Sequence, residues 1–408
     1  MSRLAIVNAR IVDPASGRDS PGSLVVDDRS IAALDVPPPD GAEVIDARGA
    51  VLAPGLIDAM AFRTDKAASL AGGITRLLLM PDQSPPLDDP ALVERAERLG
   101  KPDVWVHPLA AATVGLGGTE IAEIGLMKAA GAAGVSTGRR AIADTGVMHR
   151  LLQYATGFEL PVVTHCEDYD LTKGAVATEG EYATRWGLAA APAFAESLAV
   201  ARDIRLTEAT GAQLHIAQVT TAESVALVRA AKSRGVAVTC GVTPPHMLLN
   251  ESAVGGYRTF ARLSPPLRAE DDRKAVLDGL ADGTIDVIAS GHDPRAQDAK
   301  RLPFADAEPG AAGAATLLAL ALTLVRDGRL SLAELLARLT TAPARIFGLP
   351  EPTLTVGAAA DLVLFDPEAP WRIDSDRLPG RAGNTPFDGL PVQGRVLMTI
   401  KGGDAVRV

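Results

Sequence analysis

The strongest constraint on the fold is a series of eight short apolar runs, each of strand length, between residues 53 and 291. They read APGLIDA (53–59), ITRLLLMP (74–81), DVWVHPLA (103–110), AAGVST (132–137), PVVTHCE (161–167), QLHIAQV (213–219), VAVTCGV (236–242) and IDVIASG (285–291). Helical patterns separate most of these runs. Buried strands that alternate with helices form a parallel sheet covered by helices, and eight of them predict an α/β protein with a (β/α)8 TIM barrel.

Several helix signals lie between the runs. Pro90 sits at a first-turn position in DDPALVERAERLG, where its missing N–H costs nothing. Thr220 and Glu223 have the spacing of a capping box for a helix that runs to about Arg234. The stretch AAGAATLLALALTLV (311–325) is apolar throughout and predicts a buried helix.

Both ends of the chain have a different pattern, with short strand-like segments punctuated by Gly and Pro. RLAIVNARIV lies near the start, and GRVLMTIKGG lies near the end. We therefore predict one small β-sandwich domain built from both termini. The expected boundaries are 1–52 for its N-terminal part, 53–345 for the barrel and 346–408 for its C-terminal part.

The composition excludes several classes of function. The formal net charge is −10, which argues against nucleic-acid binding because phosphate contacts need clustered Lys and Arg. The two cysteines, Cys166 and Cys240, are too few for a disulfide framework or a Cys-rich zinc site. No run approaches the ~18 apolar residues of a membrane span. We expect a soluble, cytoplasmic protein with no membrane partner.

Six short motifs follow one another along the chain: GLID (55–58), THCED (164–168), VTPPHMLL (242–249), SPPLR (264–268), DGTIDVIASGHDP (282–294) and NTPFDG (384–389). Together they resemble the dihydroorotase family of the amidohydrolase superfamily, in its longer, multi-domain type. The resemblance implies an amidohydrolase-type barrel with a flanking β-sandwich. It also implies a binuclear metal site that activates water against a cyclic amide, with an aspartate as general acid and base.

The family's metal and acid/base positions can be located one by one in this sequence. The ligand after strand five is retained as His165, and the bridging carboxylate expected after strand four meets STGRRAIAD (136–144). Four further positions carry side chains of another kind: Met60 and Phe62 for the His-x-His pair, Gln218 for the strand-six histidine, and Gly291 for the acid/base aspartate. Zinc needs at least three protein ligands with suitable donors. We therefore expect no catalytic residue, no metal and no cofactor, with a zinc site as the alternative.

The substrate-binding positions differ from the family pattern as well. Arg63 matches the arginine that grips the substrate carboxylate only if a one-residue gap is allowed, so it is at most a vestigial contact. The family's Met-Pro-Asn-Thr is MPDQ (80–83) here, and the Asn before its Pro-Pro-Leu-Arg is Ser264. The first barrel loop is shorter than the family pattern by about ten residues, which removes part of one wall.

A metal site of a kind foreign to the family competes with a purely structural use of the polar residues. Asp58, Asp65 and Asp82 could form an unfamiliar metal site with His165 or Asp293. The structural alternative is favoured throughout, since carboxylates near strand ends also serve as caps and ion-pair partners.

The remaining histidines and one cysteine are expected to be structural. His215 and His246 are interpreted as packed side chains, and His292 as reused for structure. Glu167 and Asp168 are expected to cap the following helix or to contact Arg202. Cys166 follows His165 directly, so it should face the helices if His165 faces the barrel interior.

These observations favour a non-catalytic dihydroorotase homologue. The resemblance implies a structural or regulatory partner of the aspartate carbamoyltransferase catalytic chain in de novo pyrimidine (UMP) biosynthesis, because inactive members of the family play that role. A homodimer within a mixed assembly with transferase trimers is expected. The alternative is an active cyclic amide hydrolase with a rebuilt or single-metal site. A ligand-binding regulator is a third possibility, although no P-loop or dinucleotide motif favours it.

Overall fold

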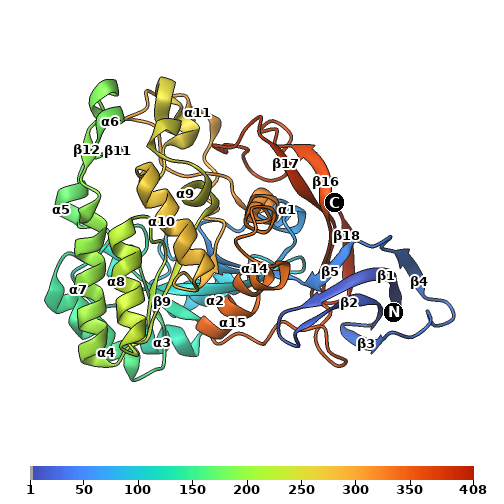
Figure 1. Ribbon diagram of the computed structural model, residues 1–408. Coiled ribbons are helices and arrows are strands. Elements are labelled where there is room, and N and C mark those ends of the chain that lie inside the picture. Colours follow the sequence, from blue (N-terminus) through green and yellow to red (C-terminus); the bar gives the residue numbers. More distant parts are fainter. Residues whose placement is uncertain (1–2) are drawn as a thin grey trace.

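A computed structural model describes residues 3–408 and contains two domains (Figure 1). The barrel strands are β6 (Leu56–Ala61), β7 (Ile74–Leu79), β8 (Trp105–Ala111), β9 (Gly134–Ser136), β10 (Val162–Thr164), β13 (Leu214–Ile216), β14 (Val238–Val242) and β15 (Val287–Ile288). They are parallel and hydrogen-bonded in chain order, and a parallel bridge between Ala61 and His292 brings the end of the barrel back to β6. The predicted TIM barrel is confirmed, and all eight predicted runs contain a strand.

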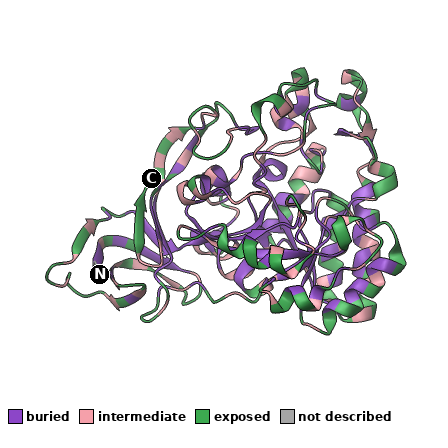
Figure 2. Cartoon of the chain, turned by 180° about the vertical axis from the view of Figure 1, so that it is seen from behind, coloured by how far each residue is buried: buried purple, intermediate pink, exposed green. Residues whose placement is uncertain are grey.

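Helices surround this sheet, and Figure 2 shows that buried residues gather on the strands and on the helix faces turned toward them. The helices on the barrel are α1 (Lys66–Ala71), α2 (Pro90–Arg98), α3 (Ile124–Ala129), α4 (Thr145–Thr156), α7 (Phe194–Thr210), α8 (Ala222–Ser233), α10 (Glu270–Ala281), α14 (Leu332–Leu339) and α15 (Thr341–Ile346). As predicted, α2 begins at Pro90. The apolar stretch at 311–325 is buried and helical, but it is divided into η4 (Ala314–Thr316), α12 (Leu317–Ala321) and α13 (Thr323–Arg326).

The predicted capping box of α8 is wrong by one residue. Thr221 is the N-cap, and its hydroxyl accepts the backbone N–H of Ser224 at 3.2 Å. Thr220 instead donates its hydroxyl to the fully buried carboxylate of Glu196. A buried carboxylate needs every available donor, and this requirement takes Thr220 away from the helix end. Glu223 accepts a hydrogen bond from Ser197 at 2.6 Å rather than closing a box.

The two ends of the chain share one sheet, which lies beside the barrel in Figure 1. Its strands are β1 (Leu4–Asp13), β2 (Arg18–Asp27), β3 (Ser30–Leu34), β4 (Glu43–Asp46), β5 (Val51–Pro54), β16 (Leu362–Arg372), β17 (Pro391–Lys401) and β18 (Asp404–Arg407). Their order is β18-β17-β16-β5-β1-β2-β3, with β4 on the first half of β1. Apolar side chains such as Ile6, Leu24, Leu52 and Ile400 fill its own core. The predicted β-domain formed by both termini is confirmed.

A buried ion pair joins the terminal sheet to the barrel. Arg76 on β7 donates to the Asp361 carboxylate at 3.1 Å, and both side chains are almost fully buried. Trp105 Nε1 donates to the same oxygen at 3.0 Å. Thr399 on β17 donates to the carbonyl of Leu70 at 2.6 Å. The contacts fix the sheet against one side of the barrel.

Short elements line the mouth at the carboxyl ends of the barrel strands: η1 (Val114–Leu116), α5 (Tyr169–Thr172), β11 (Ala177–Thr178), α6 (Glu181–Trp186), β12 (Ala190–Ala191), α9 (Pro244–Leu248), η2 (Glu251–Tyr257), η3 (Thr259–Ala261) and α11 (Gln297–Lys300). In barrels of this kind, function is built from the loops at this end. None of the helices between residues 3 and 408 is long and apolar enough to cross a membrane.

Candidate functional site

The positions that the family resemblance assigns to metal ligands meet at one point of the barrel mouth. A Cβ on Gly291 would lie 3.5 Å from Met60 Cε and 3.7 Å from Gln218 Nε2. Phe62 lines the same small cavity as Gln218 and Gly291, and that cavity has a volume of about 40 Å³. The ends of these strands therefore still meet, but the groups found there are the thioether of Met60, the ring of Phe62, the amide of Gln218 and the glycine at 291.

Gly291 has a conformation that resists restoration of a side chain. Its φ is +60°, in the left-handed region where residues with a Cβ are strained. A Cβ would also lie 2.9 Å from Thr243 Cγ2, which is closer than van der Waals contact. The backbone at this position has thus adapted to the absence of a side chain.

The guanidinium of Arg139, three residues after β9, lies at the mouth. It stacks on Phe62 at 3.7 Å from the ring centroid, and Nη1 donates to Asp293. Its Nε lies 3.8 Å from Asp82 Oδ1, and the same oxygen accepts the backbone N–H of Arg139 at 3.0 Å. Two carboxylates and an aromatic face therefore hold a fixed positive charge. The sequence contained a signal for this role, since two arginines follow strand four where the family has a carboxylate, but their function was not predicted.

Each of the two acids around this guanidinium contacts it through one oxygen, and the other oxygens, Asp82 Oδ2 and Asp293 Oδ1, are buried without a hydrogen-bond partner among residues 3–408. Asp293 also accepts a hydrogen bond from Arg295 at 2.8 Å. Burial raises the pKa of Asp82, although the positive charge of Arg139 acts in the opposite direction. Nowhere among residues 3–408 do three His, Cys, Asp or Glu side chains gather in a geometry that could hold a metal ion. The donor set at the mouth does not fit the binuclear centre of the family.

Two further carboxylates that were considered as metal ligands have structural partners. Asp58 on β6 is buried and accepts the backbone N–H of Ser290 at 2.8 Å and the hydroxyl of the same residue. Burial raises the pKa of Asp58, and the Ser290 hydrogen bonds only partly offset this. Asp65 caps α1 through the N–H of Ala68 and accepts the N–H of Arg381 at 2.6 Å. Neither side chain lines the 40 Å³ cavity.

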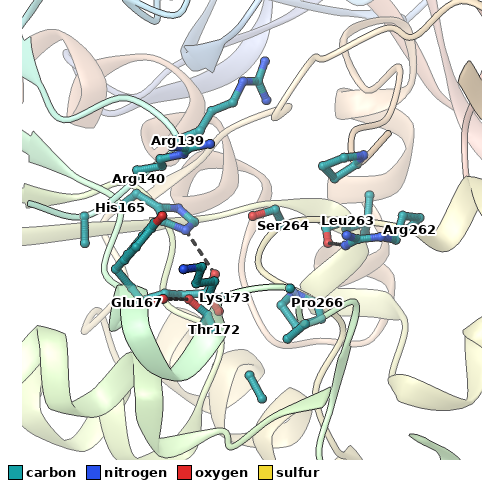
Figure 3. A pocket seen from close by; sticks show the side chains of 16 residues that line it. Arg139, Arg140, His165, Glu167, Thr172, Lys173, Arg262, Leu263, Ser264 and Pro266 are labelled. Carbon is teal, nitrogen blue, oxygen red and sulfur yellow. Dashed lines mark hydrogen bonds and ion pairs between the residues drawn. The ribbon is translucent and has the colours of Figure 1, made fainter. Parts of the chain in front are cut away.

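His165, at the retained ligand position after β10, belongs to a hydrogen-bond network. Its Nε2 lies 3.0 Å from Glu167 Oε2, as the dashed line in Figure 3 marks. Glu167 also accepts from Arg268 at 2.8 Å, so its predicted role as a helix cap or a partner of Arg202 is wrong. Asp168 does cap the following helix, α5, as predicted, by accepting the backbone N–H groups of Asp170 and Leu171. Arg202 instead pairs with Asp203. A carboxylate 6% exposed needs a buried counterion, and Arg268 supplies one where Arg202 does not.

Arg268 connects the loops after β10, β13 and β14. Besides Glu167, its guanidinium contacts Glu196 at 3.3 Å and the Thr220 hydroxyl at 2.9 Å. Burial raises the pKa of Glu167, but the His165 hydrogen bond and the nearby charges of His165 and Arg268 outweigh it and hold the value at about 2. Glu167 is therefore ionised at neutral pH and fully used by its neighbours.

Three other histidines pack within the protein. His215 Nδ1 lies 2.9 Å from the Thr239 hydroxyl, and burial lowers the pKa of His215 to about 3. His246 bridges Thr243 and the carbonyl of Pro265 and has its pKa lowered to about 4, mainly by burial. His292 Nδ1 accepts backbone N–H groups of the segment that follows residue 312. The structural interpretation of His215, His246 and His292 agrees with these contacts.

Cys166 and Arg63 lie outside the mouth cavity. Cys166 is buried, and its Sγ lies 3.6 Å from Asp203 on α7, so it faces the helices as predicted. Burial raises the pKa of its thiol well above the ordinary value. Arg63 lies in the four-residue turn between β6 and α1, and no side-chain hydrogen bond or ion pair of it is seen within the described chain, residues 3–408. It remains a predicted vestigial contact.

A second, larger cavity adjoins the first. It has a volume of about 260 Å³ and is lined by Arg139, His165 and Glu167, together with residues 172–175, 262–264 and Pro266. Figure 3 shows the 262–266 segment facing His165 and Lys173 across this space. Arg139 and Ser264 line both cavities.

Comparison of the sequence with known proteins shows the family to which this chain belongs. The amidohydrolase family model matches residues 104–406. The dihydroorotase of Syntrophotalea carbinolica is 40% identical over 98% of both chains. This chain belongs to the dihydroorotase family. The dihydroorotase of Anaeromyxobacter dehalogenans is likewise 40% identical and covers 99% of this chain and 97% of its own. Family membership agrees with the resemblance read from the six sequence motifs.

Solved structures share the fold over the whole chain. The L-hydantoinase (dihydropyrimidinase) of Arthrobacter aurescens superposes with a TM-score of 0.88 at 25% identity, covering 100% of this chain and 96% of its own. The dihydropyrimidinase of Brevibacillus agri gives a TM-score of 0.85 at 21% identity, covering 99% and 95%. These likenesses confirm the amidohydrolase type of barrel with its terminal sheet.

Proposed function

We propose that this chain is a non-catalytic member of the dihydroorotase family that acts as a structural or regulatory partner of the aspartate carbamoyltransferase catalytic chain. The observation that carries the non-catalytic part is the guanidinium of Arg139. It lies at the convergence of the family's ligand positions and is held by Asp82, Asp293 and the ring of Phe62. An internal cation in this place repels a metal ion and pairs with one oxygen of each nearby carboxylate.

The size of the inner cavity supports the same proposal. Its 40 Å³ is close to the volume of one water molecule, ~30 Å³, and far below the roughly 300–1,000 Å³ of small-molecule sites. A cyclic amide could not approach Gly291 without displacing Arg139 or Phe62. The acid/base group is absent as well, since Gly291 has no side chain to carry a proton.

The partner assignment rests on the family resemblance. A barrel held by its own core and by the Arg76–Asp361 junction does not need metals in order to fold. An interface can therefore be retained after the chemistry is lost. We place a homodimer of this chain within a mixed assembly with transferase trimers, in the cytoplasm and in pyrimidine synthesis.

Zinc content and dihydroorotate turnover test the non-catalytic part. The purified chain should contain zinc far below one equivalent and should show no turnover. Gly291→Asp should restore none, because the ligand positions at Met60, Phe62 and Gln218 remain without suitable donors. Near one zinc per chain, lost together with activity in His165→Ala, would instead establish a hydrolase with a rebuilt site.

The partner part is tested by the mass of the complex formed when this chain is co-expressed with the aspartate carbamoyltransferase of its own genome. We expect one large mixed species whose transferase activity depends on this chain. Two separate species with an independently active transferase would refute the partnership.

A further inference from the structure

Three cationic side chains surround the 260 Å³ cavity without carboxylate partners. Arg140, Lys173 and Arg262 all line it, and none of the three takes part in an ion pair with any residue from 3 to 408. Arg139 adds a fourth positive group, although its charge is shared with Asp293 and Asp82. The sequence as a whole is acidic, with a net charge of −10, so a local excess of positive charge is a specific feature of this pocket.

Arg262 is the most informative of the three. Its side chain is half-buried, and Nη1 donates only to the neighbouring carbonyl of Leu263 at 3.2 Å. Its Nε is buried and has no hydrogen-bond partner within the part of the chain that the structure describes. A guanidinium withdrawn from water without a counterion is costly, and a bound anion would offset that cost.

The one acidic group that lines the pocket, Glu167, forms no ion pair with these three cations. Glu167 is paired with His165 and with Arg268, and the pKa of about 2 keeps it ionised within that network. Arg268 is itself buried beneath the pocket and supplies a full positive charge to Glu167. The unpaired charges of Arg140, Lys173 and Arg262 therefore remain available.

We propose that this pocket binds a small phosphate-bearing anion through Arg262, Arg140 and Lys173. A phosphate group carries up to two negative charges and three acceptor oxygens on one atom, and it can accept from several cations at once. A single carboxylate offers one negative charge and two acceptor oxygens, which is fewer of both than a phosphate group offers. The volume of 260 Å³ lies just below the usual range of organic ligand sites and limits the ligand to inorganic phosphate, pyrophosphate or a small phosphate ester.

The position of the pocket separates this binding from hydrolysis. The phosphate pocket and the 40 Å³ cavity adjoin, and Arg139 lines both. Ser264 also lines both cavities and is exposed, and its hydroxyl is a further hydrogen-bond donor for an anion. Arg140, Lys173 and Arg262 line the larger pocket and not the 40 Å³ cavity, so they hold the anion away from Gly291, as an effector rather than as a substrate of the family reaction.

The test is calorimetric titration of the isolated, full-length chain with sodium pyrophosphate, with inorganic phosphate and succinate as comparison anions. We expect one pyrophosphate per chain, with affinity that falls as salt rises from 50 to 200 mM. Arg262→Gln should weaken binding about tenfold or more, since a hydrogen bond to a charged group contributes about that much. Arg140→Gln and Lys173→Gln should weaken it several-fold.

Arg150→Gln is the matched control, because Arg150 is exposed on α4 and does not line the pocket. It should bind pyrophosphate like the unmodified chain. Circular dichroism verifies folding, and the exposed Arg140 and Lys173 variants test the site even if Arg262→Gln fails to fold. Absence of binding at millimolar pyrophosphate, tighter binding of succinate, or equal affinity of all variants would overturn the proposal. These outcomes do not depend on zinc content or on the mass of the transferase complex, so failure here is distinguishable from failure of the proposed function.

Discussion

Replacement of Arg268 by Met should be one of the most destabilising single changes in the barrel. The guanidinium is 3% exposed and donates to Glu167 at 2.8 Å, to Glu196 at 3.3 Å and to Thr220 at 2.9 Å. Methionine fills similar space but leaves both carboxylates without their cation. Removing one partner of a buried ion pair costs about 3–5 kcal/mol, because the other charge stays buried and unpaired.

The upper half of that range is not expected. Glu196 keeps the backbone N–H groups of Thr220 at 2.8 Å and Thr221 at 3.1 Å after the change. Glu167 keeps His165. Urea-induced unfolding followed by circular dichroism measures the loss, and with a slope of about 3 kcal/mol/M the midpoint should fall by roughly 1 M.

Two further variants make this prediction refutable. Arg229→Met removes an exposed ion pair with Asp282 that is shorter, at 2.6 Å, but half open to solvent, and it should cost less than about 1 kcal/mol. Adding Glu196→Gln to Arg268→Met should recover part of the loss, so that the two changes are not additive. If Arg268→Met lowers the midpoint no more than Arg229→Met, the buried network does not stabilise the mouth as argued.

Three other predictions follow from buried groups. The folded pKa of Glu167, about 2, lies below its ordinary value of 4.5, so its contribution to stability is fully present above pH 4.5 and is lost as the pH falls toward 2. The difference in melting temperature between Glu167→Gln and the unmodified chain should therefore close as the pH is lowered. A constant difference would contradict this. Cys166 and Cys240 are buried with raised pKa values, so Ellman's reagent should label neither until the protein unfolds, and rapid labelling of the native chain would refute their burial. Arg76→Met leaves Asp361 unpaired at the junction and should cost about 3–5 kcal/mol; a calorimetric scan should show the terminal sheet unfolding before the barrel, and an unchanged scan would show that the pair is dispensable.

The barrel was predictable because its signal is local. Each strand is a run of a few apolar residues buried on both faces, so the run itself identifies the strand in the sequence. The start of α2 at Pro90 is likewise determined by a few neighbouring residues. The loss of ligands at Met60 and Gly291 could also be read directly from the residue types. Such features need no knowledge of what lies opposite them in space.

The ion pairs of the mouth were not predictable in the same way. Arg139 meets Asp293, which is 154 residues away, and Arg268 meets Glu167 across 101 residues. Whether such side chains touch depends on how the barrel closes and how each loop turns. The prediction of the α8 N-cap failed for a related reason. Thr220 and Thr221 are the same residue type at adjacent positions, and only the buried carboxylate of Glu196 distinguishes their roles.

The pairing of β5 with β16 has a consequence for synthesis on the ribosome. Val51 pairs with Phe365, so the edge of the N-terminal strands waits for a segment made about 310 residues later. At roughly 5–20 residues per second, that interval lasts on the order of 15–60 s. During it the barrel can assemble from local βα units while the edge of β5 remains open to solvent and to other chains. When many copies are translated close together, nascent chains should therefore be prone to aggregate through the open edge of β5. Synthesis of the last fifty residues, which include β16, closes that edge.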